Sequence, residues 1–264
     1  MLVGRTTVRV TWLQSTDIGG SGIAGYQVYR GGSLISGPNL VTGLTYQDSN
    51  LSYRTTYSYT VVAVTNSGNL SSASAAASVT TDWQLVFQDD FNRSDNFLYA
   101  SGNWAGCAYW EISRLQAFTP YGLNAYNWYD CYYQSAQTDV RVTLDLLGTS
   151  WNGITLWTEA AFLSNHPRAY RILRAGSQVF LNYYPDASTS SASTLAFAQG
   201  AGTGTFRVQA TSATRNVKVY YNNALLIDYT ETDTSRPNSG LVGFTAWLIN
   251  PGNYSTVDNF MLEK

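Results

Sequence analysis

Short runs in which apolar and polar residues alternate recur along the whole chain, and this pattern predicts β-strands. Near the start, Val8, Val10 and Trp12 share one face of such a run. The further runs with a strand pattern are Tyr26–Arg30, Tyr57–Val64, Val140–Leu146, Ile154–Trp157, Tyr170–Leu173, Val179–Tyr183, Phe206–Ala210 and Leu241–Trp247. We therefore expect an all-β protein.

Tight turns separate several of these runs. Gly31-Gly32 follows one strand pattern directly, and glycine tolerates the positive φ that a hairpin turn requires. Asn222-Asn223 lies between the runs 216–221 and 224–229, and asparagine also adopts the left-handed conformation at low cost. Both pairs predict hairpins, and strands at this short spacing are typical of β-sandwiches.

Composition narrows the class of protein. With 264 residues, two domains are expected. The 20 Tyr, 8 Trp and 10 Phe favour strands. The net charge is −2 and the 15 Lys and Arg residues form no run, which argues against a nucleic-acid partner. No apolar stretch is long enough for a membrane helix, and the first residues alternate like a strand, so we expect neither a membrane anchor nor a visible signal peptide.

Residues 1–81 carry the motifs of one sandwich domain. The segments 10–12, 23–30, 46–48 and 57–64, followed by Ser67-Gly68-Asn69, resemble a fibronectin type III domain of the bacterial and phage kind. The resemblance implies that Trp12 is the core tryptophan. It also implies that Tyr57 forms a tyrosine corner, with its hydroxyl returning to the backbone near Leu51. Both roles are structural.

One strand of that domain is missing from the pattern. Only seven residues precede Val8, where a complete first strand would stand in the family. An uncovered sheet edge invites pairing with another chain, so we expect an attachment surface there. The alternative is that Met1–Arg5 folds over the gap.

Residues 82–264 form the second expected domain, with Trp83 opening its first strand. The motifs Asp89–Asp95, Trp110-Glu111-Ile112, Gly240–Gly243 and Val257–Phe260 resemble a concanavalin A-like lectin/glucanase (LamG-like) jelly roll. Relatives with this opening and closing motif often hold a structural calcium ion. The resemblance therefore implies Ca²⁺ as the one cofactor, with Asp89, Asp90 and Asp258 as its ligands.

Catalytic patterns of this fold are missing from the sequence. Jelly-roll glycosidases need paired carboxylates on one strand face, and Glu231-Thr232-Asp233 starts such a pattern without a second glutamate. His166, the sole histidine, stands beside Pro167 as in a loop and has no nucleophile elbow to serve. We expect no enzyme activity.

Two groups of residues are candidates for glycan binding, because exposed aromatic rings and amides are what sugar recognition uses. The aromatic-rich segment 118–133 supplies a loop candidate, and strands of the inner sheet supply a second one. In the segment the alternative is loop packing with a protein interface, and in the sheet it is core packing. The candidates are Asn124, Asn127, Trp128, Tyr129 and Asp130 in the segment, and Trp157, Tyr170 and Tyr183 in the sheet.

Cys107 and Cys131 are the only cysteines and bracket this segment. They are either two buried thiols or a disulfide, and a disulfide requires an oxidising compartment. A virus particle released by lysis would reconcile a disulfide with the lack of a signal peptide.

These observations favour a non-catalytic surface or adhesion protein on a virion or outside the cell. The leading hypothesis is a phage fibre, tail or capsid-decoration component that contacts glycans or neighbouring subunits, including further copies of itself. One alternative is a secreted carbohydrate-binding accessory module of a larger enzyme. The other is a jelly-roll glycoside hydrolase with unrecognised carboxylates.

Overall fold

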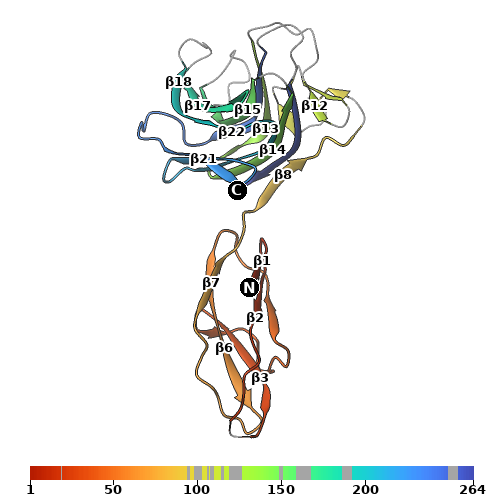
Figure 1. Cartoon of the computed structure of the whole chain (residues 1–264), viewed down its shortest axis with the longest axis vertical. Helices are drawn as coiled ribbons and strands as arrows, with labels where there is room; N and C mark the ends of the chain where they lie inside the picture. The colour runs from red at the N-terminus through yellow and green to blue at the C-terminus, as the bar shows by residue number, and fades with distance from the viewer. Residues whose placement is uncertain are drawn as a thin grey trace. The chain divides into compact units, whose positions relative to one another are not determined.

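The computed structural model describes residues 1–18, 20–93, 96–97, 103–105, 107, 110–113, 116–118, 127–148, 151–158, 168–185, 192–248 and 255–264. Its regular elements are β-strands (Figure 1). Among the described residues, no helix is long and apolar enough to span a membrane. The contacts divide the chain into two compact units, Met1–Gln84 and Leu85–Lys264.

The first unit is a sandwich of two sheets. A three-stranded sheet has the order β1 (Leu2–Val3), β2 (Val8–Thr11), β5 (Thr45–Asp48). A four-stranded sheet has the order β4 (Ser33–Leu34), β3 (Ile23–Arg30), β6 (Thr56–Thr65), β7 (Ala77–Thr80). The core between them contains Val8, Val10, Leu51 and Tyr59, because alternation turns every second residue of β2 inward.

The strand that the sequence pattern lacked is present in short form. Leu2 pairs with Arg9 and Val3 with Val8, so β1 covers part of the edge of β2. The chain turns back at Gly4, whose N–H donates to the carbonyl of Thr7 at 2.8 Å. The pairing matches the alternative expectation, in which Met1–Arg5 folds over the gap. A pairing of two residues is too short to leave an alternating pattern in the sequence.

The family-implied roles of Tyr57 and Trp12 match their positions. The backbone N–H of Ser52 donates to the hydroxyl of Tyr57 at 3.0 Å, next to Leu51. Trp12 packs edge-on against Tyr26, with 5.3 Å between the ring centroids. Both aromatic residues stabilise the sandwich.

Trp83 belongs to the first unit, although the sequence suggested that it opens the second domain. The guanidinium of Arg54 lies 4.0 Å from the centre of its ring, and Arg5 donates to its carbonyl oxygen at 2.7 Å. The ring is buried, at 8% exposure. These contacts fix the residues after Thr81 to the first sandwich, so the unit extends to Gln84.

The second unit also consists of two sheets, and Figure 1 labels several of their strands. The seven-stranded sheet has the order β10 (Trp104–Ala105), β13 (Asn127–Gln137), β22 (Gly240–Leu248), β15 (Trp151–Thr158), β16 (Ala169–Ala175), β17 (Gln178–Tyr184), β18 (Ser193–Gln199). The nine-stranded sheet has the order β21 (Ala224–Thr230), β20 (Asn216–Tyr221), β19 (Gly204–Thr211), β14 (Val140–Gly148), β23 (Ser255–Glu263), β12 (Gln116–Phe118), β11 (Glu111–Ser113), β9 (Asn96–Phe97). β8 (Leu85–Asp89) also pairs with β23.

The predicted hairpin at Asn222-Asn223 is confirmed, since these residues have φ of 45° and 68° between β20 and β21. An apolar core lies between the two sheets and includes Val142, Ile154 and Phe244. The chain is thus an all-β protein of two successive β-sandwiches, as the sequence pattern predicts.

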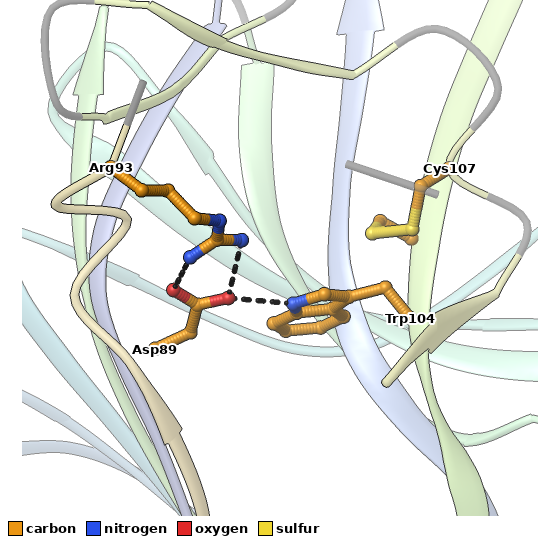
Figure 2. Close-up of a disulfide and its surroundings, with 5 residues drawn as sticks. Asp89, Arg93, Trp104 and Cys107 are labelled. Carbon is orange, nitrogen blue, oxygen red and sulfur yellow. Dashed lines mark hydrogen bonds and ion pairs between the residues drawn. A yellow bond between two sulfur atoms is a disulfide. The ribbon is translucent and has the colours of Figure 1, made fainter. Parts of the chain in front are cut away.

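A disulfide joins Cys107 to Cys131 in the second unit, with 4.4 Å between their Cα atoms. Figure 2 shows it beside the ring of Trp104. Both cysteines are buried in the core. The bond therefore ties the chain segment around residue 107 to the middle of β13.

Candidate functional site

In the aromatic segment 118–133, the residues that the structure describes lie in strands rather than in the loop that the sequence suggested. Residues 127–137 form β13 and pair with β22 along nearly their whole length. Alternation therefore sorts its side chains: Cys131 and Tyr133 contact the core, while Asp130 and Tyr132 lie on the opposite face. Only every second side chain of this strand thus points into the core. This agrees with the expectation that so many neighbouring aromatic residues cannot all be buried on one side.

We call the face of the seven-stranded sheet that points away from the core the outer face. Strand register brings polar residues of five strands together there: Tyr132 pairs with Gly243, Gly243 with Thr155, Thr155 with Arg171, and Arg171 with Asn182. In the next row Asp130 pairs with Thr245. We define the polar floor as Asp130, Tyr132, Thr155, Arg171, Asn182 and Thr245.

An ion pair crosses this floor. Arg171 Nη2 donates to Asp130 Oδ2 at 2.9 Å, although β15 and β22 lie between their strands. At the positions between Asp130 and Arg171, these two strands carry Gly153 and Gly243. Neither glycine has a side chain that would separate the two charged groups. Glycine is required at both positions, because a Cβ atom would overlap the carbonyl oxygen of Ile172 or of Cys131.

The ion pair is held in its charged form. Burial opposes ionisation of Asp130, but the charge and hydrogen bond of Arg171, with the nearby hydroxyls of Thr245 and Tyr132, outweigh it and lower the pKa of Asp130. Burial likewise opposes the charge of Arg171, but Asp130 raises the pKa of Arg171. The Arg171 guanidinium also lies over the ring of Tyr184, 4.7 Å from its centre.

Several oxygen atoms of the polar floor are buried without a hydrogen-bond partner. Buried polar groups in proteins are nearly always paired, so a cluster of exceptions on one face requires an explanation. The atoms are Asp130 Oδ1, Tyr132 OH, Thr155 Oγ1, Asn182 Oδ1 and Thr245 Oγ1. The hydroxyls of Tyr132 and Thr245 nevertheless lie close enough to the Asp130 carboxylate to stabilise its charge, so Thr155 and Asn182 are the two exceptions that stand apart from it.

An aromatic strip lies beside the polar floor on the same face. Trp151 and Phe180 are near-parallel with 6.3 Å between ring centroids, and Phe180 and Phe197 repeat this spacing. Phe180 pairs directly with Phe197, which places both rings on the outer face. Phe197 is 61% exposed on β18, the last strand of the sheet. This strip offers apolar ring surface at the edge of a polar floor.

The candidates from the aromatic segment divide into three cases. Asn124 lies outside the described residues. For Asn127, Trp128 and Tyr129 the structure describes the backbone, which lies in β13. Asp130 has the described side chain, and it contributes to the polar floor.

The inner-sheet candidates need a correction. Trp157, Tyr170 and Tyr183 belong to the core cluster, with exposures of 0%, 0% and 6%. Trp157 turns inward because a bulge in β15 gives it a φ of 49°, and its Nε1 donates to the carbonyl of Thr138. Core packing, the alternative, explains all three, and a ligand on the outer face does not reach them.

Sequence reasoning overlooked Arg171, Asn182, Phe180 and Phe197. A signal was present, because Arg171 and Asn182 interrupt strands that are otherwise strongly apolar. Alternation puts them on the face opposite Ile172 and Leu181. The alternating pattern does not predict the order of the strands in the sheet, and this order is what makes Arg171 and Asn182 neighbours of Asp130.

The three residues expected to bind calcium differ in their surroundings. Asp90 and Asp258 are close to each other, since burial and the charges of Asp145 and Asp90 raise the pKa of Asp258. Asp89 accepts hydrogen bonds from Arg93 and from Trp104 Nε1, the latter at 2.8 Å (Figure 2). It also accepts one from the backbone N–H of Phe91. Its carboxylate is thus fully engaged and does not fit the role of a metal ligand. Asp258 accepts from Gln116 and from the N–H of Asn259. Within the described part of the chain, no three acidic, histidine or cysteine residues converge as a metal site would require.

The carboxylate pattern at Glu231 has a structural explanation. Glu231 Oε2 accepts from Arg236 at 2.8 Å and from Tyr170 at 3.2 Å, and its Oε1 accepts from the N–H of Asp233. Glu263 is buried in an ion pair with Arg141. Both glutamates therefore stabilise the sandwich, while His166 and Glu159 lie outside the described residues.

Sequence comparison finds relatives among enzymes that act on polysaccharides. The chain is 51% identical over 81 residues to exoglucanase B of Cellulomonas fimi, which is 31% of this chain and 7% of that protein. It is 44% identical over 80 residues to chitinase D of Niallia circulans, which is 30% of this chain and 14% of that protein. The chain thus spans a small part of the curated relatives that it matches. No protein-family model matches the chain.

Structural comparison finds sandwiches of the same kind as the second unit. A protein of unknown function with a galectin-like fold from Bacillus subtilis aligns with a TM-score of 0.52 and 9% identity, over 68% of this chain and 96% of that one. The carbohydrate recognition domain of Emp46p aligns with a TM-score of 0.50 and 10% identity, over 69% of this chain and 98% of that one. At these identities the likeness concerns the fold.

Proposed function

We propose that the chain is a non-catalytic carbohydrate-binding accessory module of an extracellular polysaccharide-degrading protein. The second unit binds glycan through its outer face, and the first unit serves as a spacer. The observation that carries this proposal is the aromatic strip Trp151–Phe180–Phe197 beside the polar floor. Aromatic rings contact the apolar faces of sugar rings, while polar groups bind the hydroxyls.

The relatives support the accessory role. Their names describe enzymes that act on glucans and chitin, and the stretch of about 80 residues shared with them is short enough to be one module within a longer chain. The engaged state of Glu231 and Glu263 agrees with a non-catalytic module. For these reasons we prefer this function to a phage fibre, tail or capsid protein.

The test is retention by polysaccharides. The purified chain is incubated with insoluble cellulose and chitin, and with soluble glucans in affinity electrophoresis. We expect it to bind at least one of these polymers without releasing reducing sugar. Release of reducing sugar that depends on one carboxylate would show an enzyme instead.

Two variants locate the binding. Phe197→Ala removes the most exposed ring of the strip and should weaken binding markedly while the melting temperature stays unchanged. Leu225→Ala is the matched control, because Leu225 is 50% exposed on β21 of the other sheet. A site on the outer face would be contradicted if both variants lost binding equally, or if neither variant lost any.

A further inference from the structure

We propose that the second unit has a second glycan-binding site, a hollow at the end of β8 that accepts a short stretch of a sugar chain. The inference rests on the proposed function for the class of ligand and adds a separate place where that ligand binds. The side chains that line the hollow are Phe87, Gln88, Asp89, Asp90, Arg93 and Asn103.

The hollow lies between strands of the two sheets of the second unit. β8 belongs to the nine-stranded sheet through its pairing with β23, and Asn103 directly precedes β10 of the seven-stranded sheet. β10 and β18 are the two edge strands of that sheet, and Phe197 of the aromatic strip stands on β18. The hollow and the exposed end of the strip are thus at opposite edges of one sheet. Two such sites on one module would hold an insoluble polysaccharide more tightly than either site alone.

Asp89 fixes the wall of the hollow. Its carboxylate accepts a hydrogen bond from Arg93 Nη2 at 3.0 Å and one from Trp104 Nε1 at 2.8 Å (Figure 2). The bond from Trp104 joins the two sheets, and the bond from Arg93 holds the guanidinium at the hollow. A site whose side chains are already held in place loses less conformational entropy when it binds a ligand.

Four polar side chains of the hollow reach solvent. Gln88, Asp90 and Asn103 are exposed, and the side chain of Arg93 is 37% exposed. The two amides both donate and accept hydrogen bonds, and the Asp90 carboxylate accepts them. Arg93 donates to Asp89 through two N–H groups and has further N–H groups for a ligand. Sugar hydroxyls also donate and accept, so they match this mixed set.

Phe87 adds an aromatic wall. Its ring is partly buried, stacks on Tyr133 with 5.0 Å between ring centroids and meets Trp104 edge-on at 5.4 Å. An aromatic ring with a few converging polar groups is what sugar recognition uses. The volume of about 410 Å³ lies within the range of about 300–1,000 Å³ that is usual for small-ligand sites. The hollow therefore has the size and the chemistry of a sugar site.

Two tryptophan side chains can report the two sites separately. Trp104 donates to Asp89 at the hollow, and Trp151 belongs to the aromatic strip. Cellotetraose and chitotetraose are titrated into the whole chain while the indole N–H signals of both residues are followed by NMR. With at least one of these probes we expect both signals to shift, each with its own binding curve.

Substitutions assign each shift to its site. Asn103→Trp fills the hollow and should abolish the shift of Trp104 while that of Trp151 remains. Phe197→Ala should have the reverse effect. Asn92→Ala is the matched control, because Asn92 is exposed on the same turn but does not line the hollow. If Asn103→Trp does not fold, Asn103→Ala removes only the amide and should weaken binding at the hollow by about 2- to 10-fold.

The outcomes separate this inference from the proposed function. A shift of Trp151 with no shift of Trp104 would overturn the second site and leave the proposed function intact. A Trp104 shift that is unchanged by the substitutions at Asn103 would also overturn the second site. A shift of Trp104 alone would support the hollow and overturn binding at the outer face. If neither signal shifted with either probe, both proposals would be overturned.

Discussion

Arg171 donates a hydrogen bond to Asp130 at 2.9 Å across two intervening strands, and both side chains are withdrawn from solvent. Removing one partner leaves the other charge buried and uncompensated, which typically costs about 3–5 kcal/mol. We therefore expect Arg171→Leu to lower the free energy of unfolding of the second unit by this amount in urea titrations.

The double variant Arg171→Leu with Asp130→Leu is the control for that loss. It removes both charges, so it should be clearly more stable than either single variant. If the double variant lost the sum of the two single losses, the two side chains would be energetically independent.

The disulfide between Cys107 and Cys131 should stabilise the second unit through its effect on the unfolded chain. It closes a loop with a sequence separation of 24. In the entropic account a loop of this size contributes roughly 3 kcal/mol. We expect replacement of both cysteines by serine to lower the melting temperature of the second unit and leave that of the first unchanged. Mass spectrometry that found two free thiols in the oxidised protein would contradict the bond itself.

The glycines beneath the ion pair should tolerate no side chain. At Gly153 and at Gly243 a Cβ atom would overlap the backbone of the neighbouring strand, and backbone cannot move aside as the end of a side chain can. Gly153→Ala should therefore destabilise the protein by more than about 3 kcal/mol, measured by chemical unfolding.

Gly43→Ala is the control, since a Cβ atom there would have no neighbour within 4 Å. It should be within about 0.5 kcal/mol of the unmodified protein. Similar stability of the variants at positions 43 and 153 would show that β15 and β16 do not approach as closely as described.

Glu231 should make stability depend on pH. Burial opposes its ionisation, but the N–H of Asp233 and the guanidinium of Arg236 outweigh it, and the pKa of Glu231 lies below its ordinary value of 4.5. The ionised form therefore stabilises the folded state above that ordinary value. This contribution is lost as the pH falls through the lower pKa of the folded protein.

Glu231→Gln tests this linkage. The melting temperature of the unmodified protein should exceed that of the variant most at neutral pH, and the difference should shrink below about pH 4. A difference that stayed constant over this range would mean that the charge of Glu231 contributes nothing to folding.

Much of the fold follows from local pattern. The runs at 140–146 and 206–210 alternate strictly, and both are strands with their apolar side chains in the core. The Asn222-Asn223 turn was evident because few residues adopt positive φ readily. In these cases the cause lies within a few neighbouring residues, and the sequence displays it directly.

The candidate site was not predictable in the same way. Asp130 and Arg171 meet because β13, β22, β15 and β16 are adjacent in this order, which no local pattern encodes. The burial of Tyr170 and Trp157 was also hidden, because aromatic rings suit a core and a binding face equally well. Both the Asp130–Arg171 contact and the burial of these rings depend on how strands distant in sequence pair with one another.

The position of β23 has a consequence for biosynthesis. This strand lies inside the nine-stranded sheet, between β14 and the strands β12 and β8, and Phe260 pairs with Asp89. The first strand of the unit, β8, therefore has no pairing partner until the last strand, β23, has been synthesised. The nine-stranded sheet can be completed only after β23 has left the ribosome. Contacts this distant in sequence also slow folding. Nascent chains of the second unit therefore expose open strand edges during translation, and their yield should depend on chaperones more than that of the first unit.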